Sequence, residues 1–135
     1  MDLKILEKLT SEKFWKTKSK LNRTKIQRVF DNYSKKIDKS TFSTSFLNGK
    51  FVSVNFHVRD EALDSYVEFK FRFSPLNPRE SLNFSTEVDS LPEIRILYKD
   101  TTYRSYETYN KALKRDVNNK IKELNLMLAQ LEKML

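Results

Sequence analysis

The side chains with the clearest chemical potential are the cations in the first 40 residues. Residues 1–40 hold 12 Lys and Arg against 5 Asp and Glu, a net charge of +7, whereas residues 41–135 hold 14 against 13. Clustered cations are typical of proteins that bind polyanions, because each bound phosphate releases counterions. The candidate phosphate-binding residues are Lys13, Lys16, Lys20, Arg23, Lys25, Arg28, Lys35, Lys36 and Lys39.

Lysine outnumbers arginine in this set, which favours contact with a nucleic-acid backbone over the reading of bases. Phe14 and Trp15 lie among these lysines and would stack on bases if they were exposed. Two alternatives remain open. The cations either form a solvated face that keeps the protein soluble, with both rings in the core, or dock on an acidic protein surface.

Helical periodicity places several of these cations on one face. Apolar residues recur at helical spacing from residue 26 to residue 37, which predicts a helix from Asn22 or Thr24 to about Ile37. A helix-turn-helix would need a second helix over 40–46, but the alternation there favours a strand. The predicted core-facing residues are Ile26, Val29, Phe30, Tyr33 and Ile37, and the predicted solvent-facing ones are Lys25, Arg28, Asn32, Lys35 and Lys39.

A second candidate for chemistry is the run Glu68-Phe69-Lys70, with Asp60 or Asp64 upstream. This spacing resembles the Asp…Glu-x-Lys arrangement of metal-dependent nucleases. The resemblance implies two carboxylates that hold Mg²⁺ and a lysine that helps to activate water. Alternating charge on the open face of a strand explains the same pattern, so we favour the strand.

Several other chemistries are excluded by composition. The chain has one histidine, His57, and no cysteine, so disulfides, thiolate zinc sites and the usual His and Cys zinc sites cannot form. One glycine cannot supply a Walker A or GxGxxG phosphate loop. We therefore expect a non-enzymatic protein without a metal or cofactor. No signal peptide or membrane span is visible, and we expect a cytoplasmic location.

The period of the apolar residues changes from 3.6 to 2 near residue 41, which indicates strands. Asn48-Gly49 predicts a hairpin turn, because a type I′ turn needs positive φ. Weaker strands are predicted around Leu82 and Phe84 and after Pro92. The predicted inward-facing residues of the two strongest strands are Val52, Val54, Phe56 and Val58, and Val67, Phe69, Phe71 and Phe73.

A long helix is predicted from about Thr102 to the last residue. Tyr103, Tyr106 and Tyr109 either pack in the core or line a ligand cavity. Further on, apolar residues repeat in steps of four and three, as in a coiled coil, and this stripe either forms a dimer or partner interface or packs on the sheet. The flanking residues show no charge complementarity. The stripe consists of Val117, Ile121, Leu124, Leu128, Leu131 and Leu135.

Together these patterns predict one α+β domain over residues 1–135. It would comprise a basic helical segment (1–40), an antiparallel sheet of four to five strands (41–99) and a long C-terminal helix (100–135). The expected function is binding to nucleic acid through the basic helices. The alternative is an interaction module, such as an inhibitor or adaptor, that docks on an acidic protein.

Overall fold

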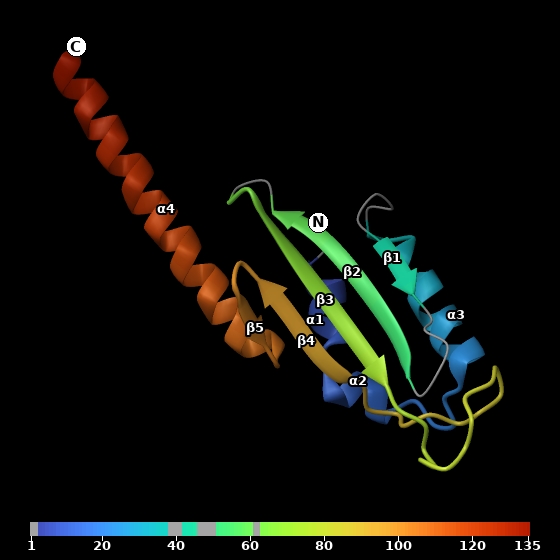
Figure 1. Ribbon diagram of the computed structural model, residues 1–135. Helices are drawn as coiled ribbons and strands as arrows, with labels where there is room; N and C mark the ends of the chain where they lie inside the picture. The colour runs from blue at the N-terminus through green and yellow to red at the C-terminus, as the bar shows by residue number, and fades with distance from the viewer. Residues whose placement is uncertain (1–2, 38–41, 46–50, 61–62) are drawn as a thin grey trace.

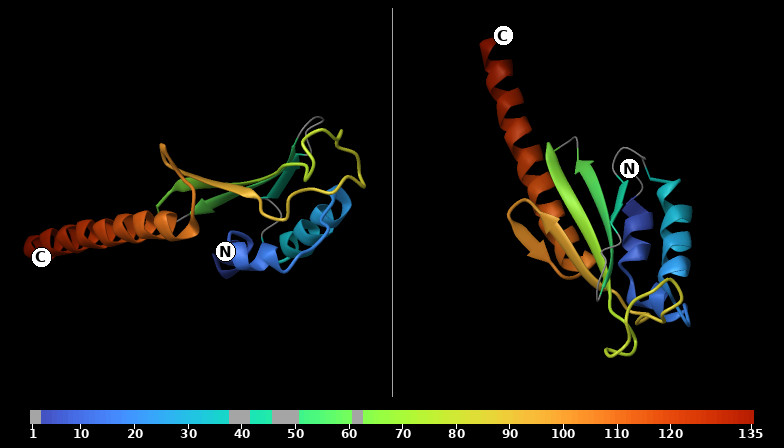
Figure 2. Two further views of the ribbon diagram at one scale, coloured as in Figure 1. Left: turned by 90° about the horizontal axis from the view of Figure 1, so that it is seen from below. Right: turned by 45° about the vertical axis from the view of Figure 1, so that its right-hand side comes forward.

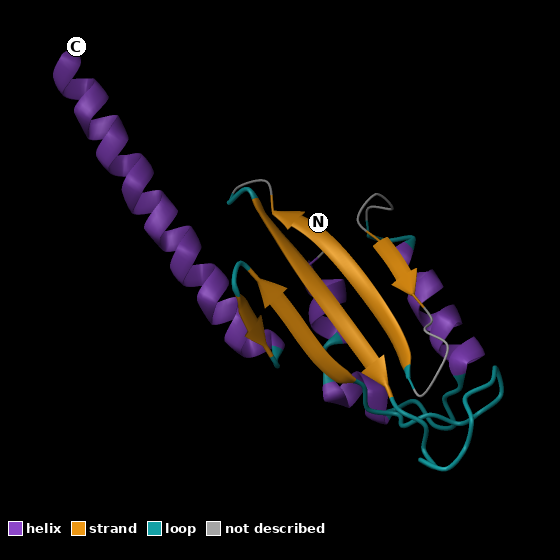
Figure 3. Ribbon diagram, in the orientation of Figure 1, coloured by secondary structure: helices purple, strands orange, loops and turns teal. Residues whose placement is uncertain are grey.

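The chain folds in the predicted α+β order, with helices first, a sheet next and one long helix last (Figures 1 and 3). The computed structural model describes residues 3–37, 42–45, 51–60 and 63–135. The helices are α1 (Leu3–Leu9), α2 (Glu12–Lys16), α3 (Arg23–Ser34) and α4 (Tyr106–Met134). The strands are β1 (Phe42–Ser45), β2 (Val52–Asp60), β3 (Ser65–Phe73), β4 (Glu93–Tyr98) and β5 (Thr101–Tyr103).

The described strands form one antiparallel sheet in the order β1-β2-β3-β4-β5. Strands β2 and β3 pair along their whole length, with Val58 opposite Val67 and Phe56 opposite Phe69. The predicted alternation along both strands is confirmed, since every second residue is buried from Val52 to Val58 and from Val67 to Phe73. The predicted turn at Asn48-Gly49 lies outside the described residues.

The predicted strand at Leu82 and Phe84 is wrong, because these residues lie in the loop between β3 and β4. Local hydrogen bonds compete there with strand pairing. The Asn83 side chain accepts from the backbone N–H of Ser85 at 2.9 Å and of Thr86 at 2.9 Å. The Thr86 hydroxyl in turn donates to the Ser81 carbonyl at 2.9 Å. Phe84 is left 65% exposed.

The C-terminal helix begins four residues later than predicted, because Thr101–Tyr103 pairs with β4. A tight turn joins these two strands, and Lys99 adopts the left-handed conformation there with φ 52°. The helix then starts after Ser105, whose hydroxyl accepts from the Thr108 backbone N–H at 3.3 Å. Helix α3 also differs from its prediction, since it ends at Ser34 and not at Ile37.

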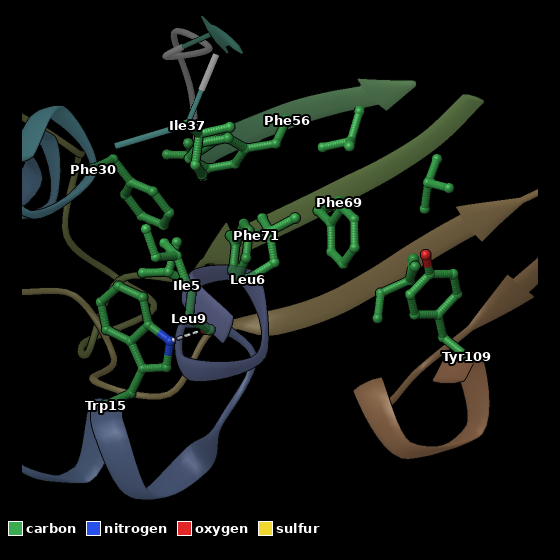
Figure 4. Packing of buried hydrophobic residues seen from close by; sticks show 14 of the residues in the cluster. Ile5, Leu6, Leu9, Trp15, Phe30, Ile37, Phe56, Phe69, Phe71 and Tyr109 are labelled. Atoms are coloured by element: carbon green, nitrogen blue, oxygen red, sulfur yellow. Dashed lines mark hydrogen bonds between the residues drawn. The ribbon is translucent and has the colours of Figure 1, made fainter. Parts of the chain in front are cut away.

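All described helices lie on one face of the sheet, and the other face carries none of them (Figure 2). The core between them is rich in aromatic side chains (Figure 4). Phe30 of α3 contacts Phe56 and Phe71 of the sheet, with ring centroids 5.6 and 5.1 Å apart. Trp15 is 0% exposed, and its indole Nε1 donates to the Leu9 carbonyl at 2.6 Å. This bond satisfies the one polar atom of the Trp15 side chain.

Within the described residues, no helix has both the length and the apolar character that crossing a membrane requires.

Candidate functional site

The structure leaves most of the predicted cations in solvent. Lys13, Lys16, Lys20, Lys25, Arg28, Lys35 and Lys36 are exposed, and Arg23 is half-buried. Lys39 lies outside the described residues. The neighbouring groups of these cations differ. Lys16 pairs with Glu12 at 3.7 Å, and the guanidinium of Arg23 lies over the ring of Phe84 at 4.8 Å.

One concave site lies among the N-terminal helices, and we call it the basic groove. It measures about 660 Å³ and is formed by α1, α2, the turn that follows α2 and one residue of α3. Four lysines and one glutamate give its lining a net charge of +3. Of the eight predicted cations that the structure describes, only Lys13 lines it. The lining residues are Lys4, Glu7, Lys8, Ser11, Lys13, Phe14, Thr17, Lys18 and Tyr33.

Two aromatic rings stand among the ammonium groups of the basic groove. Phe14 and Tyr33 meet edge to face, with centroids 5.8 Å apart. Lys8 lies over both rings, 5.5 Å from Phe14 and 5.6 Å from Tyr33. Lys18 lies 5.2 Å from Phe14, and Lys36 lies 5.7 Å from Tyr33. The groove therefore places cations beside aromatic rings, and these are the two kinds of group that proteins use to bind single-stranded nucleic acids.

Sequence reasoning missed three of the four lysines in the basic groove: Lys4, Lys8 and Lys18. A signal for two of them exists, because Lys4 and Lys8 are one helical turn apart in α1. Their convergence with Lys13 and Lys18 depends on the packing of α1 against α2, which periodicity does not reveal. Of the two rings suggested for base stacking, only Phe14 remains available, since Trp15 is buried in the core.

The residues that resemble a nuclease site are not brought together. Inward and outward positions alternate along the strands, so Asp60 shares the helix-covered face with Val58, whereas Glu68 points to the opposite face. Lys70 lies 3.5 Å from Glu68, as ordinary charge alternation predicts. His57 pairs across the strands with Glu68 and is exposed. Among the described residues, no group of three or more acidic or histidine side chains is placed to hold a metal ion.

Helix α4 is the second candidate site, because only its first part packs on the protein. Tyr109, Ala112 and Leu113 are buried, and the helix contacts β4 and β5. Tyr109 meets the rings of Phe69 and Tyr98, so core packing accounts for the predicted aromatic positions best. Every residue from 118 onward is exposed.

The exposed part of α4 carries the predicted coiled-coil stripe. Its members beyond Val117 are 50–106% exposed, and the helix projects away from the sheet (Figures 1 and 2). The alternative in which this stripe packs on the sheet of the same chain is therefore wrong from Ile121 onward. Val117 alone is partly buried against the core. The large exposed apolar residues of this part are Ile121, Leu124, Leu126, Met127, Leu128, Leu131, Met134 and Leu135.

Asp116 fixes the point at which α4 leaves the sheet. Its carboxylate accepts from the Tyr98 hydroxyl at 2.7 Å and lies 3.1 Å from the Lys99 ammonium. The hydrogen bond from Tyr98 is the main cause that holds the pKa of Asp116 below its usual value, and Lys99 and Arg115 add to it. Burial and the same bond raise the pKa of Tyr98, so its hydroxyl stays a donor.

Comparisons of this chain with protein-family models, with curated proteins and with solved structures found no match.

Proposed function

We propose that this protein is a small, non-enzymatic protein that binds nucleic acid through the basic groove. The observation that carries the proposal is the arrangement of four lysines around Phe14 and Tyr33 in a groove with one acidic residue. The lysines supply phosphate contacts, and the rings supply surfaces against which an unpaired base packs. Lysine ammonium groups act as point charges, so we expect little base specificity.

The groove favours a single strand over a duplex. Its two rings meet edge to face among the lysines that line it, and packing against a ring requires an unstacked base, which a single strand offers. Each lysine that binds a phosphate of a single strand releases about 0.7 of a counterion, so affinity falls steeply as salt rises. The exposed cations of α3, which include Lys25 and Arg28, would extend the attractive field beyond the groove.

The first test is fluorescence anisotropy of the nuclease-treated protein with labelled single- and double-stranded DNA and RNA, at low and physiological salt. We expect a single strand to bind at physiological salt. Lys8, Lys13 and Lys18 changed together to Glu should abolish that binding. The control changes Lys114, Lys122 and Lys133 on α4 to Glu, which alters the net charge equally outside the groove.

A third variant decides between the groove and the exposed face of α3. It changes Lys25, Arg28 and Lys35 to Glu and should weaken binding less than the groove variant does. Circular dichroism checks that all three variants are folded. Equal losses in the groove and α4 variants would show that net charge alone attracts the ligand, and the proposal would fail. Loss only in the α3 variant would move the site from the groove to α3.

The second candidate function is a protein-interaction module, favoured by the exposed apolar part of α4. In that case the N-terminal cations dock on an acidic protein surface, as an inhibitor or adaptor would. A pull-down after nuclease treatment would then return one defined polypeptide, and anisotropy would show no binding at physiological salt. Because the chain lacks cysteine, either function suits a reducing compartment, and we place it in the cytoplasm.

A further inference from the structure

The exposed part of α4, from residue 118 onward, projects away from the sheet, and we call it the projecting part. Together with Val117 it carries a pattern of apolar residues that is complementary to a second copy of itself. In heptad notation its core positions are a and d, and they begin with Val117 at d and end with Leu135 at a. The spacing of four, three, four, three and four residues reads the same in both directions. An antiparallel copy of the helix therefore places Val117 opposite Leu135, Ile121 opposite Leu131 and Leu124 opposite Leu128. Each of these pairs is centred on residue 126.

The flanking positions favour the antiparallel orientation. The g positions of the stripe are Lys120, Met127 and Met134, and the e positions are Asn118, Asn125 and Glu132. In an antiparallel pair each flank meets the same flank of the other helix, whereas in a parallel pair g meets e. Antiparallel pairing therefore gathers the methionines, together with Lys120, on one side of the stripe and leaves the asparagines and Glu132 on the other. Parallel pairing would place methionine against asparagine or glutamate.

We infer that two copies of this chain associate through the projecting parts of α4, as an antiparallel pair centred on residue 126. The inference does not depend on nucleic-acid binding. Seven apolar side chains from each copy, at positions 121, 124, 127, 128, 131, 134 and 135, are half or more exposed and enter the interface. At roughly 70 Å² of apolar surface each, they remove about 1,000 Å² from water, near the lower end for a specific interface.

The ends of the pair gain further contacts at the point where α4 leaves the sheet. A hollow of about 340 Å³ lies there, lined by Leu63, Lys99, Asp116 and Lys120 among others. The antiparallel register brings the last turn of the second copy to the level of Val117. Met134 of that copy then lies on the same flank as Lys120, beside the hollow. These contacts add to the interface that the stripe forms. Because the stripe is short, we expect a reversible dimer whose population depends on protein concentration.

The first test is the mass in solution, measured by sedimentation velocity over a concentration series. The wild type should move from monomer to dimer as its concentration rises. Leu124 and Leu131 changed together to Lys should give a monomer throughout. This variant should remain folded, because both side chains are exposed in the single chain. The control changes Leu126 and Ala129 to Lys, which lie off the stripe, and should dimerise like the wild type.

The second test measures orientation by spin labelling. The chain has no cysteine, so single cysteines at Asn119, Leu126 and Lys133 label one site each. These positions are all f and point away from the stripe. In the antiparallel pair, every residue away from 126 adds about 3 Å of axial separation between the two labels. The Leu126 variant should give the shortest distance, and the Asn119 and Lys133 variants should give longer and similar ones.

The possible outcomes separate the alternatives. Three equal distances would show a parallel pair and overturn the orientation that we infer. A monomer at every concentration, with no dipolar signal, would overturn the inference as a whole and leave a different protein as the occupant of the stripe. A dimer that survives in the Leu124 and Leu131 variant would place the interface elsewhere on the molecule.

Discussion

The two parts of helix α4 both carry an apolar face but have opposite surroundings. In the first part, from Tyr106 to Val117, the apolar face packs on β4 and β5, and Leu113 is 7% exposed. In the second part, from residue 118 to the end, the apolar side chains face solvent, and Leu128 is 55% exposed. Both parts continue one helix of 29 residues.

This difference follows from the lengths of the elements. A helix of that length extends about 44 Å, whereas the six residues of β4 span about 20 Å. The sheet ends before the helix does. Periodicity therefore predicts which face of a helix is apolar, while the length of the neighbouring element determines how much of that face is covered. The uncovered remainder is where a second protein surface can bind.

The largest expected effect comes from truncating a leucine in the packed part. Leu113→Ala should lower the free energy of unfolding by about 2–4 kcal/mol, because it removes buried methyl groups and leaves a cavity between helix and sheet. Urea denaturation of the dilute protein, where association contributes nothing, measures this loss. A loss below about 0.5 kcal/mol, as at a surface position, would show that the packed part is no firmer than the projecting part.

The second largest effect is expected from a substitution of Asp116, at the boundary between the two parts of α4. Asp116→Asn should lower the free energy of unfolding by about 1–2 kcal/mol at neutral pH, since it removes the charge between Tyr98 and Lys99. The pKa of Asp116 is lowered in the folded state, so its stabilisation is present above the ordinary pKa of the carboxyl. That stabilisation is lost as the pH falls through the lowered value.

Denaturation of both proteins at neutral pH and at a pH below the lowered pKa of Asp116 tests this dependence. The difference between the wild type and Asp116→Asn should shrink in acid, because protonation removes the same charge from the wild type. A difference that stays constant with pH would mean that the carboxylate contributes through its shape and not its charge. Asp116→Asn should retain the basic groove, which lies on other helices.

The sequence was sufficient to predict the α+β fold, because strong periodic signals act over short distances. Alternation along β2 and β3 placed eight inward-facing residues correctly, and the same logic placed Ile26 and Phe30 in the core. The missed feature was β5, a strand of three residues that is too short to show alternation. The false strand at Leu82 and Phe84 had apolar spacing, but side-chain hydrogen bonds from Asn83 and Thr86 formed a loop instead.

The candidate sites were harder to predict because they depend on how elements pack. Net charge by segment pointed to the part of the chain that contains the basic groove. It could not separate Lys8 and Lys18, which gather around Phe14, from Lys16, which pairs with Glu12. For α4 the sequence predicted the apolar stripe, but the stripe does not reveal where the sheet ends. The sequence therefore left open whether the stripe packs on the sheet or on another protein chain.

The smallest expected effect is the counterpart of the first and completes the comparison of the two parts of α4. Leu128→Ala makes the same chemical change as Leu113→Ala, but in a side chain that solvent already surrounds. In dilute solution it should change the free energy of unfolding by less than about 0.5 kcal/mol, because alanine favours the helix and little burial is lost. At high concentration the wild type should gain stability by association, and the variant should gain less.

Denaturation at two concentrations measures both quantities. A large loss in dilute solution would show that the projecting part packs on its own chain after all, and equal gains at high concentration would remove Leu128 from the interface.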